Sequence, residues 1–335
     1  MGGNRKEESF YESETMKKIQ MIVNNGAGTG SAARVWEKTE ELLKEKGISY
    51  EAWVTTHEKH GMELARKICE QNKEEKIVLL VVGGDGTLNE VLNGITDFDR
   101  IFLGVIPTGS GNDFARNLGI SKNTEETLEE ILRYIEKEEA GEVLPRIDLG
   151  EVTWDGCVEP RIFGISAGIG LDAIVCKKAL HSSLKKVLNR FHLGKLTYLM
   201  LTVQTLFSMK TFDCKIQSGN EEKTYSKMIF AATMSLRAEG GGVPMAPSAT
   251  PYDGMLSMGH ASGIPKWKTF FLLPLLALGK QERIREFFIE EAPIIKVDTN
   301  QPVVLHADGE YCGEIQKAEF RCLEKKLWLL HKAKR

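Results

Sequence analysis

The feature that most constrains this chain is a run of six consecutive apolar residues at 77–82, which leads directly into the glycine-rich sequence GGDGT at 83–87. An uninterrupted aliphatic run is typical of a strand buried on both faces, as in a parallel sheet. Shorter apolar runs predict further strands at 19–23, 50–54 and 101–106, with helices at 32–46 and 61–70 between them. Strands that alternate with helices predict a parallel α/β domain with right-handed crossovers.

The pattern changes after the hydrophilic segment 136–142, where short strand-like segments begin to dominate. Two helical insertions interrupt them, at about 184–208 and 266–288. Short strands at irregular spacing predict an antiparallel β domain. The predicted strands are 147–153, 161–166, 212–217, 226–233, 255–259, 294–297, 303–307, 319–323 and 327–330. The fold class is therefore α/β, with an N-terminal parallel domain followed by an antiparallel β domain.

Composition excludes several classes of protein. The 335 residues include 44 Lys and Arg against 47 Asp and Glu, and the formal net charge of −3 gives no sign of a nucleic-acid partner. The six cysteines show no C-x-x-C spacing, which argues against a zinc knuckle or a redox pair. No apolar run is long enough to span a bilayer, and residues 1–15 lack the apolar core of a secretory signal. We expect a soluble cytoplasmic protein in which residues 1–16 form a flexible leader.

The segment GGDGT carries the first chemical signal. A helix that starts at the carboxyl end of a parallel strand presents unpaired N–H groups to an anion, and glycines allow a phosphate to approach them closely. Residues 87–90 match a capping box that would start this helix. Asp85 would repel phosphate unless a cation lay between them, so we expect Mg²⁺ there. The alternatives are a strand–helix turn without a ligand and a purely structural Asp85 that caps the helix.

Two further glycine-rich loops follow predicted strands, at 24–31 and 108–113. They do not fit the familiar templates. The P-loop pattern G-x-x-x-x-G-K-[ST] occurs nowhere in the chain, and the glycines at 26, 28 and 30 have the wrong spacing for a dinucleotide fingerprint. The loops therefore predict a nucleotide or phosphate site of another kind.

The segment VGGDGTLNEV at 82–91 resembles the catalytic family of diacylglycerol kinases and sphingosine kinases, including its bacterial lipid kinases. The segment PTGSGNDFAR at 107–116 agrees with this family. GGDGT alone is shared with NAD kinases, but its combination with the second segment and the late DGE at 308–310 is specific. The resemblance covers about residues 17–330, and its further segments are 147–150, 166–173 and 240–242. The chain departs from the family at 24–25, where Asn-Asn replaces Asn-Pro, and at 232–236, where the family often has an Asn-Gly pair.

This resemblance implies an ATP-dependent lipid kinase with its active site in an interdomain cleft. The nucleotide-binding domain would span 17–141 and a β-sandwich substrate domain 142–318, and the segment 319–335 would return to the first domain. The catalytic residues would be Asp308, Glu310 and Asp85, with the general base in 308–310. Magnesium would be held at a further site by Thr250, Asp253 and Met255. The residues expected at ATP are Asn24, Asn25, Gly26, Ala27, Gly28, Thr56, Gly84, Asp85, Gly86, Thr87, Leu88, Asn89, Glu90 and Ser110.

Three functions stay open at this point. The first is a kinase that converts diacylglycerol to phosphatidic acid in phospholipid biosynthesis, with ATP and Mg²⁺ as cofactors. The second is an NAD kinase-like phosphotransferase, and the third is a catalytically silent lipid-binding relative. Asp308-Gly309 also has a structural interpretation, because Asp-Gly between two strands predicts a tight hairpin. His306 is expected to be packed or surface-exposed rather than catalytic, and Arg116 to brace its loop.

A basic stretch suggests how such an enzyme would reach a lipid. Residues 174–211 contain seven Lys and Arg and no Asp or Glu. Within it, the apolar stripe at 184–191 carries most of the charge and is the expected membrane-facing edge, and the stripe at 196–207 is expected to pack on the β domain. The segment 266–273, with Trp267, is a candidate addition to the membrane-facing edge. We therefore expect a peripheral protein at the anionic inner face of a membrane. A homodimer stays open.

Overall fold

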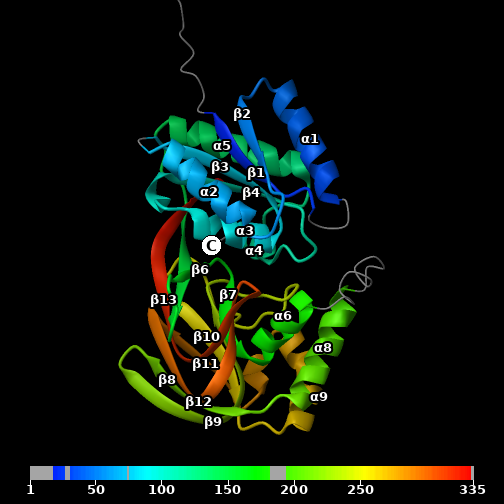
Figure 1. Ribbon diagram of the computed structural model, residues 1–335, viewed down its shortest axis with the longest axis vertical. Helices are drawn as coiled ribbons and strands as arrows, with labels where there is room; N and C mark the ends of the chain where they lie inside the picture. The colour runs from blue at the N-terminus through cyan, green and yellow to red at the C-terminus, as the bar shows by residue number, and fades with distance from the viewer. Residues whose placement is uncertain (1–17, 27–30, 74, 182–193, 333–335) are drawn as a thin grey trace, which may run out of the picture.

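Two bodies are stacked along the long axis of the computed structural model, which describes residues 18–26, 31–73, 75–181 and 194–332 (Figure 1). The first body, above in that view, is an α/β layer structure. The second, below, consists mainly of antiparallel strands with helices on one side. The predicted leader at 1–16 lies outside the described residues.

Four parallel strands in the order β4-β3-β1-β2 form the sheet of the first body. Their bounds are β1 (Ile19–Val23), β2 (Tyr50–Val54), β3 (Ile77–Gly83) and β4 (Ile101–Pro107). The helical elements are α1 (Ser31–Glu45), α2 (His60–Gln71), α3 (Asp85–Gly94), η1 (Phe98–Arg100), α4 (Asp113–Leu118) and α5 (Thr124–Glu139). The predicted strands and the two predicted helices of this body are confirmed to within one residue at each end.

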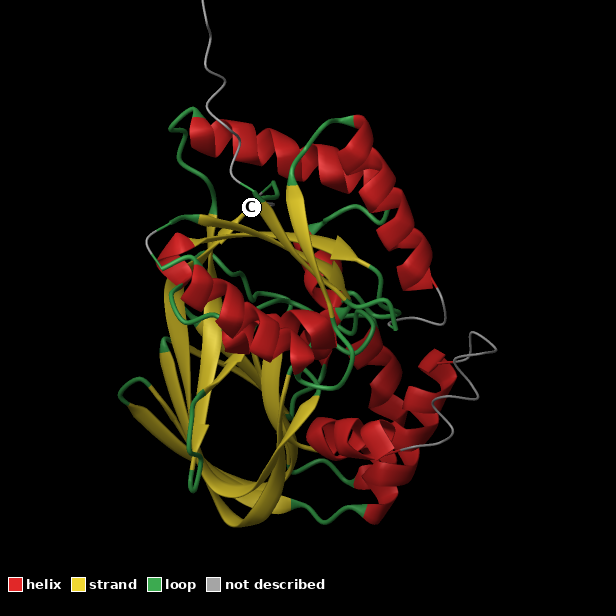
Figure 2. Cartoon of the chain, turned by 45° about the horizontal axis from the view of Figure 1, so that its top comes forward, coloured by secondary structure: helices red, strands yellow, loops and turns green. Residues whose placement is uncertain are grey.

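Burial on both faces explains why β3 is apolar without interruption. All its residues are buried. Leu79 and Val81 belong to the core that packs α2 and α3 on one face of the sheet, whereas Val78 and Leu80 belong to the core beneath α1 and α5 on the other. Figure 2 shows helices on both faces of this sheet. Because successive side chains of a strand alternate between faces, both sets of positions must be apolar here.

Antiparallel pairing dominates the second body. One path through it runs β11-β10-β9-β7-β12-β13, with β8 beside β9 and β12, and with β5 between β13 and β6. The strands are β5 (Arg146–Trp154), β6 (Arg161–Phe163), β7 (Ser166–Gly170), β8 (Phe212–Ser218), β9 (Glu221–Met234), β10 (Leu256–Ser262), β11 (Phe287–Ala292), β12 (Ile294–Ala307) and β13 (Glu310–Leu329). The helical elements are α6 (Leu171–His181), α8 (Gly194–Ser208), α9 (Lys266–Ala277) and η2 (Gln281–Arg283).

The structure corrects several predicted elements of this body. The segments 294–297 and 303–307 are one strand, β12, and 319–323 and 327–330 fall almost entirely on one strand, β13. The segment 161–166 is divided between β6 and β7. The insertion at 266–288 is helical only to Ala277 and ends in β11, and α6 was not predicted at all. Of the insertion at 184–208, the part from Gly194 is α8, and residues 184–193 lie outside the described residues.

Strand β13 is shared between the two bodies. It pairs with β12 and β5 over most of its length, and its last residues, Trp328 and Leu329, pair in parallel with Phe102 and Leu103 of β4. Leu327 and Leu329 are fully buried in the core beneath α2 and α3. The end of the second body is therefore an integral strand of the first.

Close packing of α2 against α3 yields a stability prediction. A Cβ atom added at Gly94 would lie 2.2 Å from the Met62 carbonyl oxygen and 2.8 Å from the Ala65 Cβ. Because a backbone atom stands in the way, we expect Gly94→Ala to lower the free energy of unfolding by about 1–3 kcal/mol. Chemical denaturation measures this change. Gly26→Ala is the matched control, since its nearest contact would be an ordinary 3.5 Å, and an equal loss in both variants would contradict the packing argument.

Candidate active site

Two glycine-rich loops of the first body pack backbone against backbone at the carboxyl edge of the sheet. The Thr108 N–H donates to the Gly83 carbonyl at 2.9 Å. A Cβ added at Gly109 would lie only 2.8 Å from the Cα of Gly84. Any larger residue at Gly109 would therefore separate the loops. This close approach explains why both segments need glycine, and it places the starts of α3 and α4 side by side.

Asp85 joins these two helix starts. It is the first residue of α3, and its Oδ2 and Oδ1 accept hydrogen bonds from the backbone N–H groups of Asp113 (2.9 Å) and Phe114 (3.1 Å). Asn112, at the N-cap position of α4, provides no side-chain cap of its own. Asp85 therefore caps α4 rather than its own helix. Burial raises the pKa of Asp85 to about 6, although the two backbone donors oppose the shift.

The predicted capping box at the start of α3 is wrong. Gly84 occupies the N-cap position and makes no side-chain bond there. The Thr87 hydroxyl instead accepts a hydrogen bond of 2.9 Å from the Asn24 side-chain amide, and Glu90 accepts from the backbone N–H groups of Lys59 (2.8 Å) and Gly61 (2.9 Å). Glu90 thus caps α2. Both side chains connect neighbouring loops of the predicted nucleotide site rather than closing a local turn.

The other residues expected at ATP are placed as follows. The Asn24 Oδ1 accepts from the Gly26 N–H at 3.1 Å, and the buried Oδ1 of Asn25 has no hydrogen-bond partner among the described residues. The Thr56 hydroxyl lies 3.0 Å from the His57 Nδ1 and 3.2 Å from the His60 Nδ1. Ala27 and Gly28 lie outside the described residues. The Leu88 side chain is part of the core beneath α2 and α3, so only its backbone could face a ligand.

Asp308 occupies the turn between β12 and β13 and has a left-handed backbone, with φ 47°. This confirms the hairpin interpretation of Asp308-Gly309. Its carboxylate also accepts four hydrogen bonds, from the backbone N–H groups of Gly164 (2.8 Å), Ile165 (2.8 Å) and Ser166 (3.0 Å) and from the Asn89 side chain (2.9 Å). Burial nevertheless raises its pKa above the ordinary value. The turn therefore projects an anchored carboxylate toward α3.

Two sets of hydrogen bonds from Asn side chains connect the two bodies on either side of this carboxylate. On one side, the Asn93 side chain of α3 donates to the Ile162 carbonyl and accepts from the Ile162 N–H, each at 2.9 Å. On the other side, the Asn117 side chain of α4 makes the same pair of contacts with Ala238, at 2.8 and 3.0 Å. The Gly241 N–H also donates to Asp113 at 2.8 Å. The relative position of the bodies is thus fixed on both sides of the site.

Arg116 braces the second loop, as predicted. It donates to the Gly111 carbonyl at 2.6 Å and forms an ion pair with Asp113 at 2.5 Å. A Cβ added at Gly242 would lie 2.9 Å from its guanidinium. Close packing of Arg116 therefore explains the glycine at this position of the 240–242 segment.

A large pocket of about 870 Å³ opens from this junction into the second body. Its polar end is lined by Asp85, Gly86, Ser110, Asp308 and Glu310. The Glu310 carboxylate comes from β13 and lies over the 83–87 loop, 3.6 Å from where a Cβ at Gly86 would be. The rest of the wall is mostly apolar and is provided by β9, β10, α6, α8 and α9. The geometry thus joins carboxylates from both bodies to the entrance of an apolar chamber.

Comparisons with known proteins assign this arrangement to a family. Family models match the chain twice, as the diacylglycerol kinase catalytic domain over residues 18–142 and as the YegS C-terminal NAD kinase beta sandwich-like domain over residues 166–331. A Bacillus subtilis (strain 168) protein named "Putative lipid kinase YtlR" is 30% identical over 293 residues, which cover 87% of this chain and 93% of the relative. The chain belongs to this lipid kinase family.

Other relatives agree. The protein named diacylglycerol kinase from the same Bacillus subtilis strain is 26% identical, with 89% of this chain and 91% of the relative covered. Among solved structures, a Bacillus anthracis str. Sterne protein described as "a putative diacylglycerol kinase" has the same fold, with a TM-score of 0.71 at 20% identity and coverage of 95% of this chain and 98% of that chain. The expected two-part fold is therefore confirmed.

The lipid kinase also contains a polar cluster that the sequence did not single out as a unit. His306, Asp172 and Glu239 line the pocket, and their ligand atoms lie within 4.8 Å of one another. The Gly309 N–H donates to the His306 Nδ1 at 3.1 Å, so the ring proton lies on Nε2 and is donated to the Asp172 Oδ2 at 3.0 Å. A metal on Nε2 would require a proton on Nδ1, where it would oppose the Gly309 N–H. The cluster therefore fits a hydrogen-bonded positioning role better than a metal site.

Glu239 extends this cluster toward the turn that carries Asp308. Its carboxylate is hydrogen-bonded to the Ser166 hydroxyl, and the Ser166 backbone in turn holds Asp308. Burial raises the pKa of Glu239 to about 7. Glu239 lies on the 237–243 loop that Asn117 and Asp113 hold. Nothing in the local sequence could reveal these contacts, because the partners are 73 to 128 residues away along the chain.

The titration of Asp85 offers a test of this geometry in the lipid kinase. Its pKa rises from 3.8 to about 6 on folding, so the native state holds more protons than the unfolded state between these values, and stability falls as pH rises through this window. We expect the free energy of unfolding of the wild type, relative to Asp85→Asn, to fall by at most about 3 kcal/mol from pH 4 to pH 7. Urea unfolding of both proteins across this range measures the difference. A pH-independent difference would contradict the burial of this carboxylate.

Proposed function

We propose that this lipid kinase transfers the γ-phosphoryl group of ATP to the hydroxyl of diacylglycerol, giving phosphatidic acid, with Mg²⁺ as cofactor. The observation that carries the proposal is the pocket itself, which has three carboxylates from two bodies at its polar end and an apolar chamber beyond them. Phosphoryl transfer requires alignment, charge neutralisation and a carboxylate that orients the attacking hydroxyl. An apolar chamber next to such a site suits an acyl chain.

The nucleotide would bind to the loops of the first body. The starts of α3 and α4 lie side by side there, and Gly86 and Gly109 line the pocket, where their backbone would face phosphate oxygens. Asp85 and Asp113 are close enough for their charges to interact. A cation that lies between these carboxylates and the phosphates would relieve both repulsions, so Asp85 is our candidate for holding Mg²⁺. When bound, the ion would neutralise charge on the transferred group.

We assign the acceptor hydroxyl to Asp308 and Glu310. Asp308 would act as the general base, and Glu310, which lies over the nucleotide loop, would share the proton or contact Mg²⁺. The raised pKa of Asp308 favours proton uptake, whereas its four donors hold the carboxylate in one position. The acceptor must therefore approach a fixed base rather than a mobile one.

A further magnesium site is proposed at the 250–255 segment. Asp148 accepts from the backbone N–H groups of Gly254 and Lys325, and Asp253 accepts from the Met255 N–H at 3.0 Å. Burial raises the pKa of Asp148, and the charges of Asp253 and Glu324 raise it further. Carboxylates that repel one another, joined by the backbone carbonyls that we expect Thr250 and Met255 to provide, would offer the hard oxygen ligands that Mg²⁺ prefers.

The apolar chamber also separates this proposal from the two alternatives. A soluble dinucleotide acceptor has no use for a mostly apolar chamber, which disfavours an NAD kinase-like activity. A catalytically silent lipid-binding protein would not need carboxylates to converge at the chamber entrance. The direct test is a radiolabelled ATP assay with diacylglycerol, other lipid alcohols and NAD as acceptors. Labelling of NAD alone, or of nothing, would contradict the proposal.

Replacement of the base provides the mechanistic test. We expect Asp308→Asn to lower kcat by about 10²–10⁴, because a general base typically contributes this factor. ATP affinity should change little, since Asp308 faces the acceptor. The NH₂ group of the new Asn side chain would also face a backbone N–H that donates to the Asp308 carboxylate in the wild type. The unfolding midpoint must therefore be measured together with the activity.

Asn89→Ala is the matched control for that structural effect. It removes one donor to Asp308 but leaves the carboxylate in place, so it should cost stability with a smaller loss of kcat. If Asp308→Asn raised the KM for ATP strongly while kcat persisted, Asp308 would be a nucleotide or structural residue instead.

A further inference from the structure

Helix α9 has an unusual combination of composition and exposure. Nine of its twelve residues are apolar, with the sequence KWKTFFLLPLLA, and they cover every side of the helix. A helix that is apolar all round is normally buried. All residues of α9 are described, yet only Thr269 is buried. The helix therefore exposes more apolar surface to solvent than a soluble environment explains.

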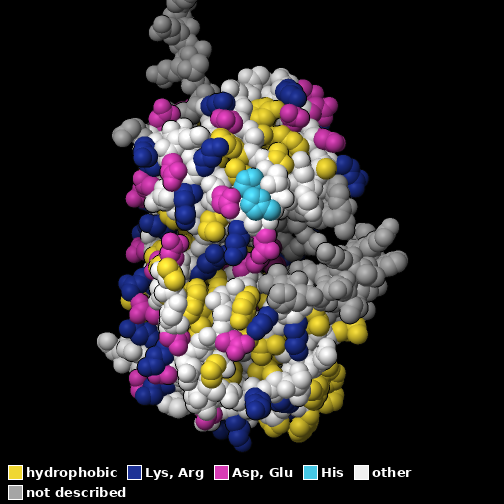
Figure 3. All heavy atoms as spheres, in the orientation of Figure 1, with side chains coloured by type: hydrophobic (Ala, Val, Ile, Leu, Met, Phe, Trp, Pro, Cys, Tyr) yellow, Lys and Arg dark blue, Asp and Glu magenta, His cyan; other side chains and the backbone are white. Residues whose placement is uncertain are grey.

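Neighbouring helix α8 extends this apolar surface. We define the α8–α9 face as the set of large apolar side chains that are between 40% and 69% exposed on the two helices and directly after α9. Its members are Leu199, Met200, Phe207, Trp267, Phe270, Phe271 and Leu278. Figure 3 shows hydrophobic side chains gathered over this corner of the second body. The stripe predicted at 196–207 to pack on the β domain is thus divided, with Leu206 buried and Leu199, Met200 and Phe207 exposed.

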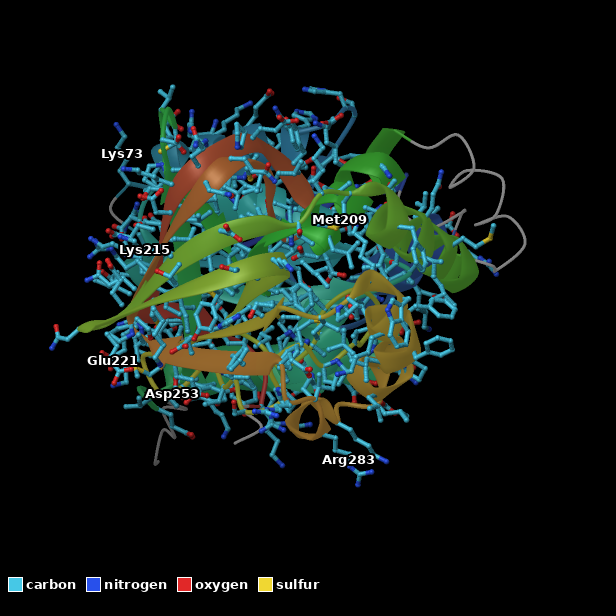
Figure 4. All side chains as sticks on the ribbon, turned by 90° about the horizontal axis from the view of Figure 1, so that it is seen from below. Lys73, Met209, Lys215, Glu221, Asp253 and Arg283 are labelled. Atoms are coloured by element: carbon cyan, nitrogen blue, oxygen red, sulfur yellow. The ribbon has the colours of Figure 1, made fainter. Side chains whose placement is uncertain are left out.

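Specific contacts hold the two helices in this arrangement. The Lys266 ammonium donates to the carbonyl groups of Phe207 and Met209 at the end of α8. Lys268 forms an ion pair of 2.8 Å with Glu286, and the rings of Phe207 and Phe270 lie 6.4 Å apart. Seen from below, the β8–β9 hairpin with Glu221 projects on the opposite side of the body, so it does not cover this face (Figure 4).

The pocket reaches this face. Leu199 lines the pocket and is 51% exposed, and Leu272, Leu273 and Leu276 of α9 line the pocket from the other helix. The opposite end of the apolar wall is near Asp308, where Ser166 of β7 pairs with Met234 of β9. Four residues further along β7, Gly170 pairs with Phe230, which also lines the pocket. At about 3.3 Å per residue, the chamber runs at least about 13 Å along these strands. An acyl chain could therefore extend from Asp308 toward α8 and α9.

We propose that the α8–α9 face inserts into one leaflet of an anionic phospholipid membrane and that the lipid acceptor enters the pocket between these two helices. The inference rests on the proposed lipid acceptor. A helix of twelve residues is about 18 Å long, which is too short to cross the hydrocarbon core. Among the described residues, no helix is long and apolar enough for a membrane span. Shallow insertion, with Trp267 at the interface, remains the way for α9 to bury its apolar surface in lipid.

Charge favours a membrane as the occupant of this face. Neither α8 nor α9 contains Asp or Glu. Lys210 follows α8, and Lys280 and Arg283 follow α9, so basic residues lie at the ends of both helices. Basic side chains near an anionic leaflet are attracted to it, and the attraction weakens as salt screens it. The stripe at 184–191, the expected membrane-facing edge, lies outside the described residues.

The test is flotation of the full chain with vesicles of phosphatidylcholine and phosphatidylglycerol. We expect Trp267→Glu with Phe271→Glu to weaken vesicle binding at least tenfold, because each substitution places a charge where an aromatic ring would enter lipid. Neither residue lines the pocket. The rate on a short-chain, water-soluble diacylglycerol should therefore stay within twofold of the wild type. Val143→Glu with Val158→Glu is the matched control, since these side chains are 91% and 97% exposed elsewhere on the chain, and it should bind vesicles normally.

The fluorescence of Trp267 provides a second measurement, which reports on α9 itself. Trp267→Phe should still bind vesicles but lose the part of the fluorescence blue shift that arises from Trp267. Equal flotation of the Trp267→Glu/Phe271→Glu protein and the wild type would overturn the inference. A wild-type dimer that this variant dissociates, without any vesicle binding, would also overturn it and identify the face as a self-interface. The wild type could also float with vesicles but phosphorylate no lipid, while the Trp267→Glu/Phe271→Glu protein fails to float. That result would sustain the membrane face and refute the proposed function.

Discussion

The arrangement of the active site depends on the hydrogen bonds that the Asp308 carboxylate accepts. This carboxylate lies at the tip of the β12–β13 hairpin and binds the three consecutive N–H groups of residues 164–166, which connect β6 to β7. The Asn89 amide adds a fourth bond from α3 of the other body. One side chain therefore fixes a hairpin, an interstrand connection and a helix at a single point. Four donors can stabilise a buried negative charge that would otherwise be costly.

Side chains also connect separate segments at the predicted nucleotide loops. Asp85, Thr87 and Glu90 all lie in the first two turns of α3, yet each bonds to a different neighbouring segment. Because the helix start is stabilised through its neighbours, the loops that would surround ATP are connected before any ligand arrives. The contacts of Asn117 and Asp113 extend this connection to the 237–243 loop at the acceptor end of the pocket. The proposed phosphate and acceptor ends of the site thus share one network of side-chain hydrogen bonds, most of them to backbone groups.

Periodicity in the sequence predicted strands β1 to β4 and helices α1 and α2 to within one residue, because burial on both faces of β3 and on one face of each helix determines where apolar residues occur. It gave no bounds for α4 or α5. It predicted the β body less well. The polar residues at 298–302 divide the pattern of β12, where the register shifts, and α6 has apolar side chains on too many sides to show one face. The motifs at 83–87, 107–116 and 308–310 pointed to residues that do converge on the pocket. The caps formed by Asp85 and Glu90, and the cluster of His306, Asp172 and Glu239, depend on partners far along the chain, which no local pattern can reveal.

The shared strand β13 has a consequence for the order in which this protein can be built. Leu327, Leu329 and Leu330 complete the buried cores on the two faces of the first sheet, and β4 gains its outer neighbour only when these residues arrive. The α/β body is therefore unfinished until residues 327–330 have left the ribosome, although its other strands are synthesised first. Folding of the two bodies cannot proceed as two separate events, and a cut before residue 327 would leave the nucleotide-binding half with an open edge and an exposed apolar seam.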